Sequence, residues 1–261
     1  MHAPPHRDTV AITDLSALLE NYRRIQKYIG PSVRFMGVVK GNAYGHGMTE
    51  CARTALDAGA AMLGVAYAME GVRLREEGIQ APILVMACEG PEWVETLAAN
   101  NLTIGLASFE TLHELKKYLH LKRARCRVHI KVDTGMGRVG IQPEEAERLL
   151  LEAMETPGVF VEGIYSHFPA ADEDRDDYTR GQISRFLRLL DDLSGKGLRP
   201  PMAHLCNSAG ILKFPEAHLD IVRPGIMAYG LLPYPGSENI LRLLPALSWR
   251  STVAFVKNVP A

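Results

Sequence analysis

Short, continuously apolar runs alternate with amphipathic stretches along most of the chain. Continuous apolar runs are typical of parallel strands covered on both faces, and apolar positions three or four residues apart are typical of helices. We therefore expect strands that are mostly followed by helices. The predicted strands cover 33–39, 62–66, 83–86, 102–106, 128–132, 159–165, 203–206 and 219–222, and the predicted helices 50–58, 69–77, 92–99, 109–118, 143–155, 177–196 and a short 209–212.

Eight strands in register with helices favour an α/β fold, the (β/α)8 or TIM barrel. A doubly wound open sheet remains the alternative, because periodicity does not distinguish a closed sheet from an open one. A short strand at 10–12 and a helix capped by Thr13 or Asp14 precede these units.

The end of the chain has a different pattern, because apolar and polar residues partly alternate over 247–260, as in a half-exposed strand. This strand either pairs with 10–12 or begins a second, β-rich domain, and we favour the second interpretation. The predicted organisation is a disordered lead-in over 1–9, a barrel over 10–240, and the first strands of a truncated C-terminal β-domain over 241–261.

Composition narrows the functional classes. The chain has 261 residues, 47% of them hydrophobic, with a formal net charge of −1. No basic stripe indicates nucleic-acid binding, and no apolar run approaches the roughly 20 residues of a membrane helix. The N-terminus lacks the apolar core of a signal peptide. Four cysteines without a C-x-x-C motif argue against a zinc site and favour free thiols in the cytoplasm.

Polar residues gather where the predicted strands end, which in a barrel is the face that carries the active site. Lys40 directly follows the first strand, and a loop with three glycines is expected to follow it over 41–47. The amine of Lys40, half out of water, is disfavoured as a cation and can attack a carbonyl carbon. Lys131 lies inside the fifth strand, where its charge needs a partner or a chemical change that removes it. The residues expected at this face are Lys40, Tyr44, Met86, Lys131, Arg138, His167, Asn207, Ser208, Arg223, Gly225 and Ile226.

The loops after strands seven and eight are the usual phosphate site of such barrels. Ser208 offers a hydroxyl there, and Gly225 and Ile226 offer backbone amides. A Schiff-base lysine opposite a phosphate cradle suits pyridoxal 5'-phosphate. His167 and His204, by residue type alone, are assigned to packing or supporting hydrogen bonds.

Two motifs point elsewhere but do not fit their context. Residues 135–140 match the dinucleotide pattern G-x-G-x-x-G, yet Pro143 looks like the first helical residue, which leaves these glycines outside the helix and disfavours a nicotinamide dehydrogenase. The acidic run 172–177 resembles a calcium loop, but Asp177 stands where the tight-turn glycine belongs. We expect no metal site.

Five stretches together resemble the alanine racemase family of fold-type III pyridoxal phosphate enzymes, and the resemblance covers essentially the whole chain. They are V-V-K-G-N-A-Y-G-H-G (38–47), K-V-D-T-G-M-G-R-V-G (131–140), S-H-F (166–168), H-L-C-N-S-A (204–209) and R-P-G-I (223–226). Gly41 stands where many relatives have alanine.

The resemblance implies a role for each site residue. Lys40 carries the cofactor and moves the α-proton on the face used by D-alanine, and Arg138 contacts the cofactor's phenolic oxygen and the substrate carboxylate. Arg223, supported by His204, faces the pyridine nitrogen. Lys131 matches a carbamylated lysine whose anion pairs with Arg138. The phosphate is held by Tyr44, Ser208, Gly225 and Ile226, and Met86, His167 and Asn207 complete the cofactor site.

The resemblance also implies a reaction and a partner. The family interconverts L- and D-alanine with two bases and supplies D-alanine for peptidoglycan, and its full-length members are homodimers. The second base is a tyrosine in the C-terminal β-domain, and the chain stops before it, so we expect a fragment with little or no racemisation alone. The alternatives are a non-catalytic pyridoxal phosphate carrier on the same barrel and a serine or broad-specificity racemase.

Overall fold

The computed structural model describes residues 9–260, and its parallel strands form one sheet in the order β8-β7-β6-β5-β4-β3-β2-β9. Backbone hydrogen bonds from Asp220 N to Ala203 O (3.2 Å) and from Arg223 N to Cys206 O (3.0 Å) join the two end strands. The sheet is therefore rolled into a barrel, and the doubly wound alternative is wrong. The strands are β2 (Arg34–Val38), β3 (Met62–Val65), β4 (Ile83–Val85), β5 (Thr103–Leu106), β6 (Cys126–Lys131), β7 (Val159–Tyr165), β8 (Met202–His204) and β9 (Ile221–Val222).

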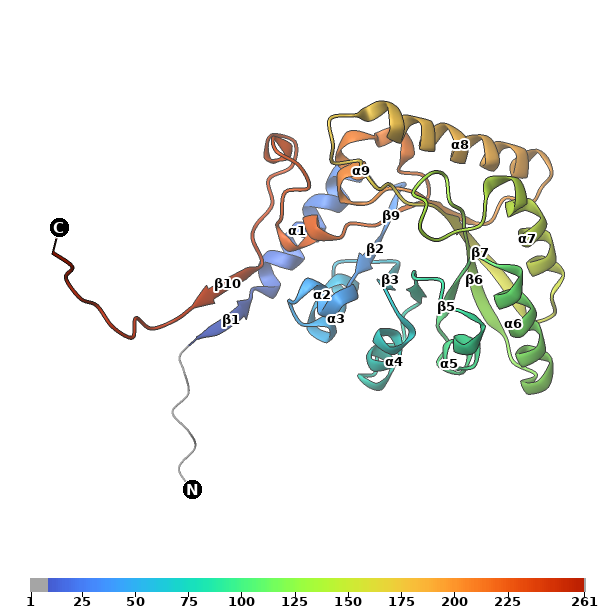
Figure 1. Cartoon of the computed structure of the whole chain (residues 1–261), viewed down its shortest axis with the longest axis horizontal. Coiled ribbons are helices and arrows are strands. Elements are labelled where there is room, and N and C mark those ends of the chain that lie inside the picture. The colour runs from blue at the N-terminus through green and yellow to red at the C-terminus, as the bar shows by residue number, and fades with distance from the viewer. Residues whose placement is uncertain (1–8, 261) are drawn as a thin grey trace, which may run out of the picture.

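Helices surround the strands, as Figure 1 shows. Asp14 caps the first helix through its carboxylate, which accepts hydrogen bonds from Ser16 N and Ala17 N, and Pro143 is the first residue of α7, both as predicted. The helices are α1 (Leu15–Ile29), α2 (Lys40–Tyr44), α3 (Met48–Asp57), α4 (Ala68–Glu76), α5 (Val94–Ala99), α6 (Phe109–Lys122), α7 (Pro143–Glu155), α8 (Asp176–Gly195) and α9 (Ser208–Lys213), with 3-10 turns η1 (Pro91–Trp93), η2 (Pro215–Ala217), η3 (Ile226–Tyr229) and η4 (Ser237–Asn239).

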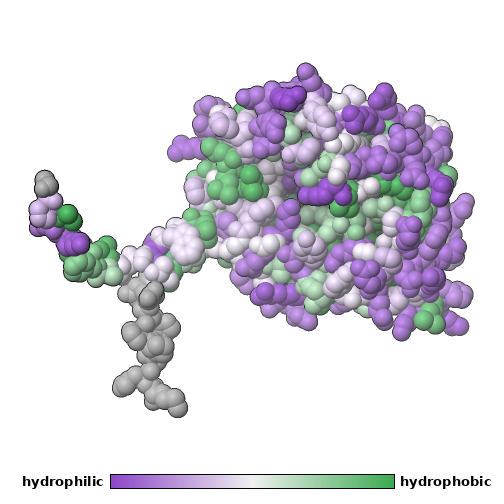
Figure 2. Space-filling view, in the orientation of Figure 1, coloured by the Kyte–Doolittle hydropathy of each residue, from purple (hydrophilic) through white to green (hydrophobic). Residues whose placement is uncertain are grey.

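Two strands lie outside the barrel. β1 (Val10–Thr13) and β10 (Leu247–Arg250) pair antiparallel, with Val10 opposite Arg250, and form the arm that leaves the barrel in Figures 1 and 2. The predicted strand over 247–260 is thus shorter than expected, since residues 251–260 have no regular structure. The pairing with the N-terminal strand is present, and the domain boundary at 240 stays a prediction. The predicted lead-in over 1–9 lies outside the described residues except for Thr9.

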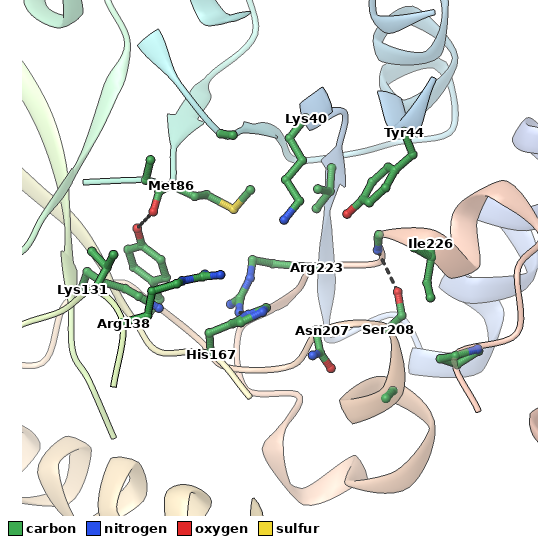
Figure 3. Close-up of a pocket in the computed structure, with 18 of the residues that line it drawn as sticks. Lys40, Tyr44, Met86, Lys131, Arg138, His167, Asn207, Ser208, Arg223 and Ile226 are labelled. Carbon is green, nitrogen blue, oxygen red and sulfur yellow. Dashed lines mark hydrogen bonds between the residues drawn. The ribbon is translucent and has the colours of Figure 1, made fainter. Parts of the chain in front are cut away.

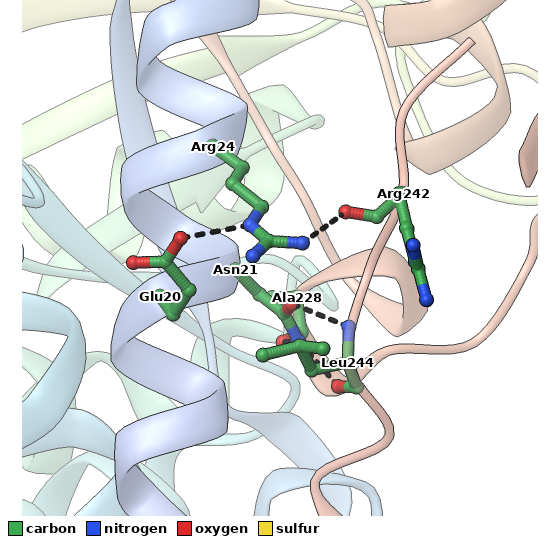
Figure 4. Close-up of polar contacts among 6 residues, drawn as sticks. All are labelled: Glu20, Asn21, Arg24, Ala228, Arg242 and Leu244. Atoms are coloured by element: carbon green, nitrogen blue, oxygen red, sulfur yellow. Dashed lines mark hydrogen bonds and ion pairs between the residues drawn. The ribbon is translucent and has the colours of Figure 1, made fainter. Parts of the chain in front are cut away.

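A buried asparagine ties the first helix to the last part of the barrel (Figure 4). Asn21, fully buried on α1, donates through Nδ2 to Ala228 O (2.9 Å) and Leu244 O (2.7 Å), and its Oδ1 accepts from Leu244 N (2.8 Å). Arg24, one turn further, donates to Arg242 O at 2.9 Å. These bonds satisfy backbone groups of an irregular segment that would otherwise be buried without partners.

The barrel interior is filled on one side by large side chains that need glycine opposite them. Met36, Met62, Leu84, Tyr165 and Ile221 form a buried cluster inside the sheet. A Cβ on Gly105 would lie 2.5 Å from Tyr165 Oη, so only glycine leaves room for the phenol at the end of β7. The interior packing therefore delivers Tyr165 to the C-terminal face.

Candidate active site

A cavity of about 540 Å³ opens at the C-terminal ends of the strands. It is lined by every residue that the sequence placed at this face (Figure 3). His204, which was predicted to support Arg223, does not line the cavity and is fully buried against that arginine. Strands β2, β6 and β7 and the segments that follow β2, β3, β4, β6, β7, β8 and β9 contribute to the lining. Residues distant in the chain are thus brought to one chamber by closure of the barrel.

Lys40 stands at the start of a left-handed turn, where the sequence predicted only a loop. Gly41, Asn42, Ala43 and Tyr44 have φ values of 62°, 54°, 55° and 53°. Such a conformation costs about 1–2 kcal/mol for each non-glycine residue. Two side-chain oxygens stabilise the turn. The carboxylate Oε1 of Glu70 accepts a hydrogen bond from Gly41 N (2.6 Å), and the amide Oδ1 of Asn42 accepts one from Met48 N (2.9 Å). The turn directs Lys40 and Tyr44 into the same cavity (Figure 3).

The environment of Lys40 favours its neutral amine. Burial lowers its pKa, and the positive charges of Arg138 and Arg223 lower it further, whereas Glu70 opposes them. Burial also raises the pKa of the Tyr44 phenol to about 12, so this side chain keeps its proton. The cavity therefore presents one nucleophilic amine beside one hydroxyl donor.

Arg223 is a buried cation without a carboxylate partner among the described residues. Its Nη1 donates to His204 Nδ1 (2.7 Å), and its Nη2 donates to Ser166 O (2.9 Å), Leu205 O (3.0 Å) and His167 Nδ1 (3.1 Å). Burial lowers the pKa of the guanidinium to about 10, which leaves it charged near neutral pH. The guanidinium of Arg223 is thus a charged donor at the wall of the cavity, where it can interact with a hydrogen-bond acceptor of a ligand.

Two histidines behind Arg223 form a chain whose proton positions follow from that cation. A guanidinium only donates, so His204 Nδ1 accepts and the proton of neutral His204 is on Nε2. That nitrogen lies 2.9 Å from His129 Nδ1, which must accept in turn. The proton of His129 is then on its buried Nε2, for which no hydrogen-bond partner exists among the described residues. Tyr165 stacks on His204, with ring centroids 4.7 Å apart, and fixes its plane.

The hydrogen bonds from Arg223 through His204 to His129 require both imidazole rings to be neutral. We therefore expect the stability of the folded protein to fall in acid. Burial and the charge of Arg223 lower the pKa of His129 to about 3. Between pH 3 and 6.5 the unfolded chain binds the proton that the folded chain excludes, so the free energy of unfolding falls as the pH falls through this window. In His129→Asn the amide oxygen still accepts from His204 but does not titrate. We expect urea titrations at pH 4, 5 and 6.5 to show a shallower loss for this variant, by up to about 1.4 kcal/mol per pH unit. Equal slopes would contradict the assignment.

Two hydroxyls and two backbone amides converge at the opposite side of the cavity, where a phosphate was predicted. Ser208 Oγ accepts from Gly225 N (3.0 Å) and Met227 N (3.3 Å). A Cβ on Gly225 would lie 2.6 Å from Tyr44 Oη and 3.7 Å from Ser208 Oγ. Two hydroxyls and two amides thus surround a space that any larger side chain at position 225 would fill. This donor set fits the phosphate of pyridoxal phosphate, and Lys40 and Arg223 fit its aldehyde and ring nitrogen.

Lys131 and Arg138 form the third side of the cavity. Lys131 is 5% exposed, and its Nζ lies 4.5 Å from the centroid of the Tyr165 ring. Burial, followed by the charge of Arg223, lowers its pKa to about 7. Among the described residues it has no carboxylate within ion-pair distance. The partner that the sequence required for Lys131 is thus the aromatic ring of Tyr165, and the lowered pKa gives this lysine a substantial neutral fraction near pH 7.

Comparison with known proteins supports the same site. The family model described as "Alanine racemase, N-terminal domain" matches residues 13–233. The chain is 43% identical over 255 residues to the alanine racemase of Symbiobacterium thermophilum and 40% identical over 257 residues to that of Geobacillus stearothermophilus. The chain belongs to the alanine racemase family. The two alignments include 98% and 97% of this chain and 67% and 65% of the relatives. The chain therefore spans about two thirds of the length of each relative.

Solved structures of alanine racemases share the fold. The enzyme of Clostridium difficile 630 in complex with cycloserine superposes with a TM-score of 0.92 at 32% identity, covering 99% of this chain and 71% of that one. The enzyme of Bacillus anthracis with bound L-Ala-P gives a TM-score of 0.89 at 38% identity, covering 98% of this chain and 67% of that one. The predicted family, the barrel and the class of enzyme, an amino-acid racemase, are confirmed.

Several residues of the alanine racemase site were missed in the sequence. Tyr165 ends β7 and could have been found, since strand ends carry the site. His129 is a polar residue within an otherwise apolar strand, a weaker signal. Glu70 lies on α4, far along the chain from Lys40, and nothing in its local pattern indicated the contact.

In the described residues no helix has the length and apolarity to cross a bilayer, and no cluster of His, Cys, Asp and Glu has metal-site geometry.

Proposed function

We propose that this chain binds pyridoxal phosphate through Lys40 and moves the α-proton of alanine. The observation that carries the proposal is the convergence of an amine of lowered pKa, a buried Arg223 without a carboxylate partner, and the cradle around Gly225 in one cavity. Bound pyridoxal phosphate supplies an electron sink that acidifies the α-hydrogen of an amino acid.

Each residue then has a task that its position supports. Lys40 takes and returns the α-proton on the face used by D-alanine, and Arg138 orients the substrate carboxylate. Arg223 faces the pyridine nitrogen and, as a donor that cannot accept, keeps that nitrogen unprotonated. His167 and His204 hold Arg223 in place. The phosphate is held by Tyr44, Ser208, Gly225 and Ile226, while Met86 and Asn207 line the pocket.

We further propose that Lys131 is carbamylated. Its neutral amine is the form that adds carbon dioxide, and the product is an anion placed near Arg138 and Arg223, whose charges already influence it. The N–H proton is released to solvent as the N–C bond forms, and an amine whose protonated form the two arginines repel becomes an anion that they attract.

The wider role follows from family membership. We propose that the enzyme supplies D-alanine for peptidoglycan in the cytoplasm and works as a homodimer, in which the second proton carrier is the tyrosine of the family's C-terminal β-domain. The alternatives, a pyridoxal phosphate carrier and a serine or broad-specificity racemase, use the same barrel and differ in turnover and in substrate.

Reductive trapping tests the proposal. The protein incubated with pyridoxal phosphate is expected to turn yellow, and borohydride followed by proteolysis is expected to place the pyridoxyl group on the peptide that contains Lys40. A label on another lysine, or a colourless protein that binds NADH, would overturn it. Assays with L-alanine, D-alanine and L-serine then separate the two racemases, and α-hydrogen exchange separates both from a carrier.

A further inference from the structure

The loop that carries Arg138 is closed at its base against the barrel. Asp133 N donates to Ile141 O (2.8 Å), and Ile141 N donates to Lys131 O (2.9 Å), so the chain leaves β6 and returns to it after residues 134–140. The outer side of the loop is held by α8, where Arg185 donates to Thr134 O and Tyr178 to Gly135 O. These contacts secure the start and the end of the loop but not its tip.

Arg138 lies at that tip and depends on its backbone for its direction. The side chain lines the cavity, and the residue is exposed overall. Among residues 9–260 no hydrogen bond or ion pair fixes the guanidinium. A long side chain with no partner keeps its rotamer freedom, and whatever places the backbone of residues 136–138 places the charge.

The carboxylate of Asp133 occupies the inside of the loop. Its Oδ1 accepts from Gly135 N at 2.9 Å and from Gly137 N at 3.1 Å. The two glycines have φ values of 140° and 68°, so the loop bends in a conformation that exposes their amides inward. Asp133 is 8% exposed. Although burial by itself raises the pKa of this carboxyl, the backbone amides lower it by more, and it is an anion at neutral pH.

We propose that Asp133 is a positioning residue that sets the place of Arg138, and through it the binding of the substrate carboxylate. This rests on the proposed function for the role of Arg138. The bond from Gly137 N is the most important one, since Gly137 directly precedes Arg138 and the hydrogen bonds from α8 reach only Thr134 and Gly135. Asp133 itself does not line the cavity, and its Oδ1 is turned to the loop amides.

Two substitutions separate the carboxylate's bonds from its charge. Asp133→Ala removes the acceptor, and Asp133→Asn keeps an oxygen in the same place. In protein loaded with pyridoxal phosphate, propionate serves as the carboxylate probe, and its binding is followed by the cofactor absorbance. We expect the Ala variant to bind propionate about tenfold or more weakly and to raise the KM for alanine more than it lowers kcat. The Asn variant is expected to restore most of the affinity.

Hydrogen exchange gives a readout that does not involve turnover. In cofactor-free protein, the peptide covering 132–142 is expected to exchange faster in Asp133→Ala than in Asp133→Asn or the unsubstituted chain. Asp191→Ala, on the exposed face of α8, is the matched control and is expected to change neither measurement. Unchanged exchange, or faster exchange with unchanged propionate affinity, would overturn the positioning role. If the unsubstituted protein binds no pyridoxal phosphate, the proposed function is wrong. The exchange measurement in cofactor-free protein then still tests the loop by itself: equal exchange of peptide 132–142 in Asp133→Ala and the unsubstituted chain would show that Asp133 does not hold the loop.

Discussion

Replacing Lys40 by alanine is expected to abolish covalent attachment of pyridoxal phosphate and to slow α-proton transfer by about 10³-fold or more. The physical reason is that Lys40 is a cavity amine whose pKa is lowered by burial and by two arginines, and it stands on the turn that carries Tyr44 to the cradle around Gly225. Lys131, the other amine that lines the cavity, lies on β6. The measurement is the exchange of the α-hydrogen of D-alanine in deuterium oxide, followed by NMR. Exchange needs one base only, so it reports on Lys40 whether or not the opposite face has its own proton carrier.

Three comparisons guard this result. Exchange of L-alanine is expected to be slower than that of D-alanine, because Lys40 is assigned to one face of the substrate. Lys40→Arg keeps the charge but not a neutral amine and is expected to be as inactive as Lys40→Ala. Lys117→Ala, at an exposed position on α6, is expected to behave as the unsubstituted protein. Residual exchange in Lys40→Ala near that of the parent would remove Lys40 from the reaction.

Replacing Gly225 by alanine is expected to weaken pyridoxal phosphate binding by about 10- to 100-fold. The new Cβ would lie 2.6 Å from Tyr44 Oη, closer than real contacts allow, so the phenol has to leave the cradle. Tyr44 packs against Tyr229, with ring centroids 5.2 Å apart, which restricts where it can go. Loss of one hydrogen bond to a charged phosphate costs about 1.5–3 kcal/mol, which corresponds to the stated range. The dissociation constant is measured by absorbance titration of cofactor-free protein.

The choice of ligand and of control identifies the cause. Pyridoxal, which lacks the phosphate, is expected to bind the variant and the parent equally well. Gly195→Ala, at the end of α8, has no neighbour within 4 Å of the new Cβ and is expected to leave both affinities unchanged. Equal weakening of both ligands would show that the cradle is not where the phosphate is held.

Much of the barrel could be predicted because strands that are buried on both faces have mostly apolar sequences. β7 at Val159–Tyr165 and α7 at Pro143–Glu155 have the predicted bounds, since a mostly apolar run and a proline at the first helical position are local signals. The last strand was predicted over 219–222, and β9 is shorter, at Ile221–Val222. The tail over 251–260 was predicted as strand and is not, because alternation alone does not supply a partner to pair with.

The residues of the site could be predicted from the sequence, but the contacts among them could not. Chemically distinctive residues after strand ends, such as Lys40 and Arg223, were found because the closed barrel brings all such ends to one face. The left-handed turn after Lys40 was read as an ordinary loop, since Asn42, Ala43 and Tyr44 carry no preference for positive φ strong enough to announce it. Its support comes from Glu70 on another helix, a contact that no local pattern encodes.

The amino-acid sequence by itself determined the family, the order of strands and helices, and the residues that reach the mouth of the barrel, because these follow from periodicity and from motifs of ten residues or fewer. Only the tertiary structure decided which groups meet. It placed His129 behind His204, turned the Asp133 carboxylate to the amides of the Arg138 loop, and left Arg223 without an anion among the described residues. Hydrogen-bond direction and the pKa of a buried group depend on neighbours from several strands, so they exist only once the sheet has closed.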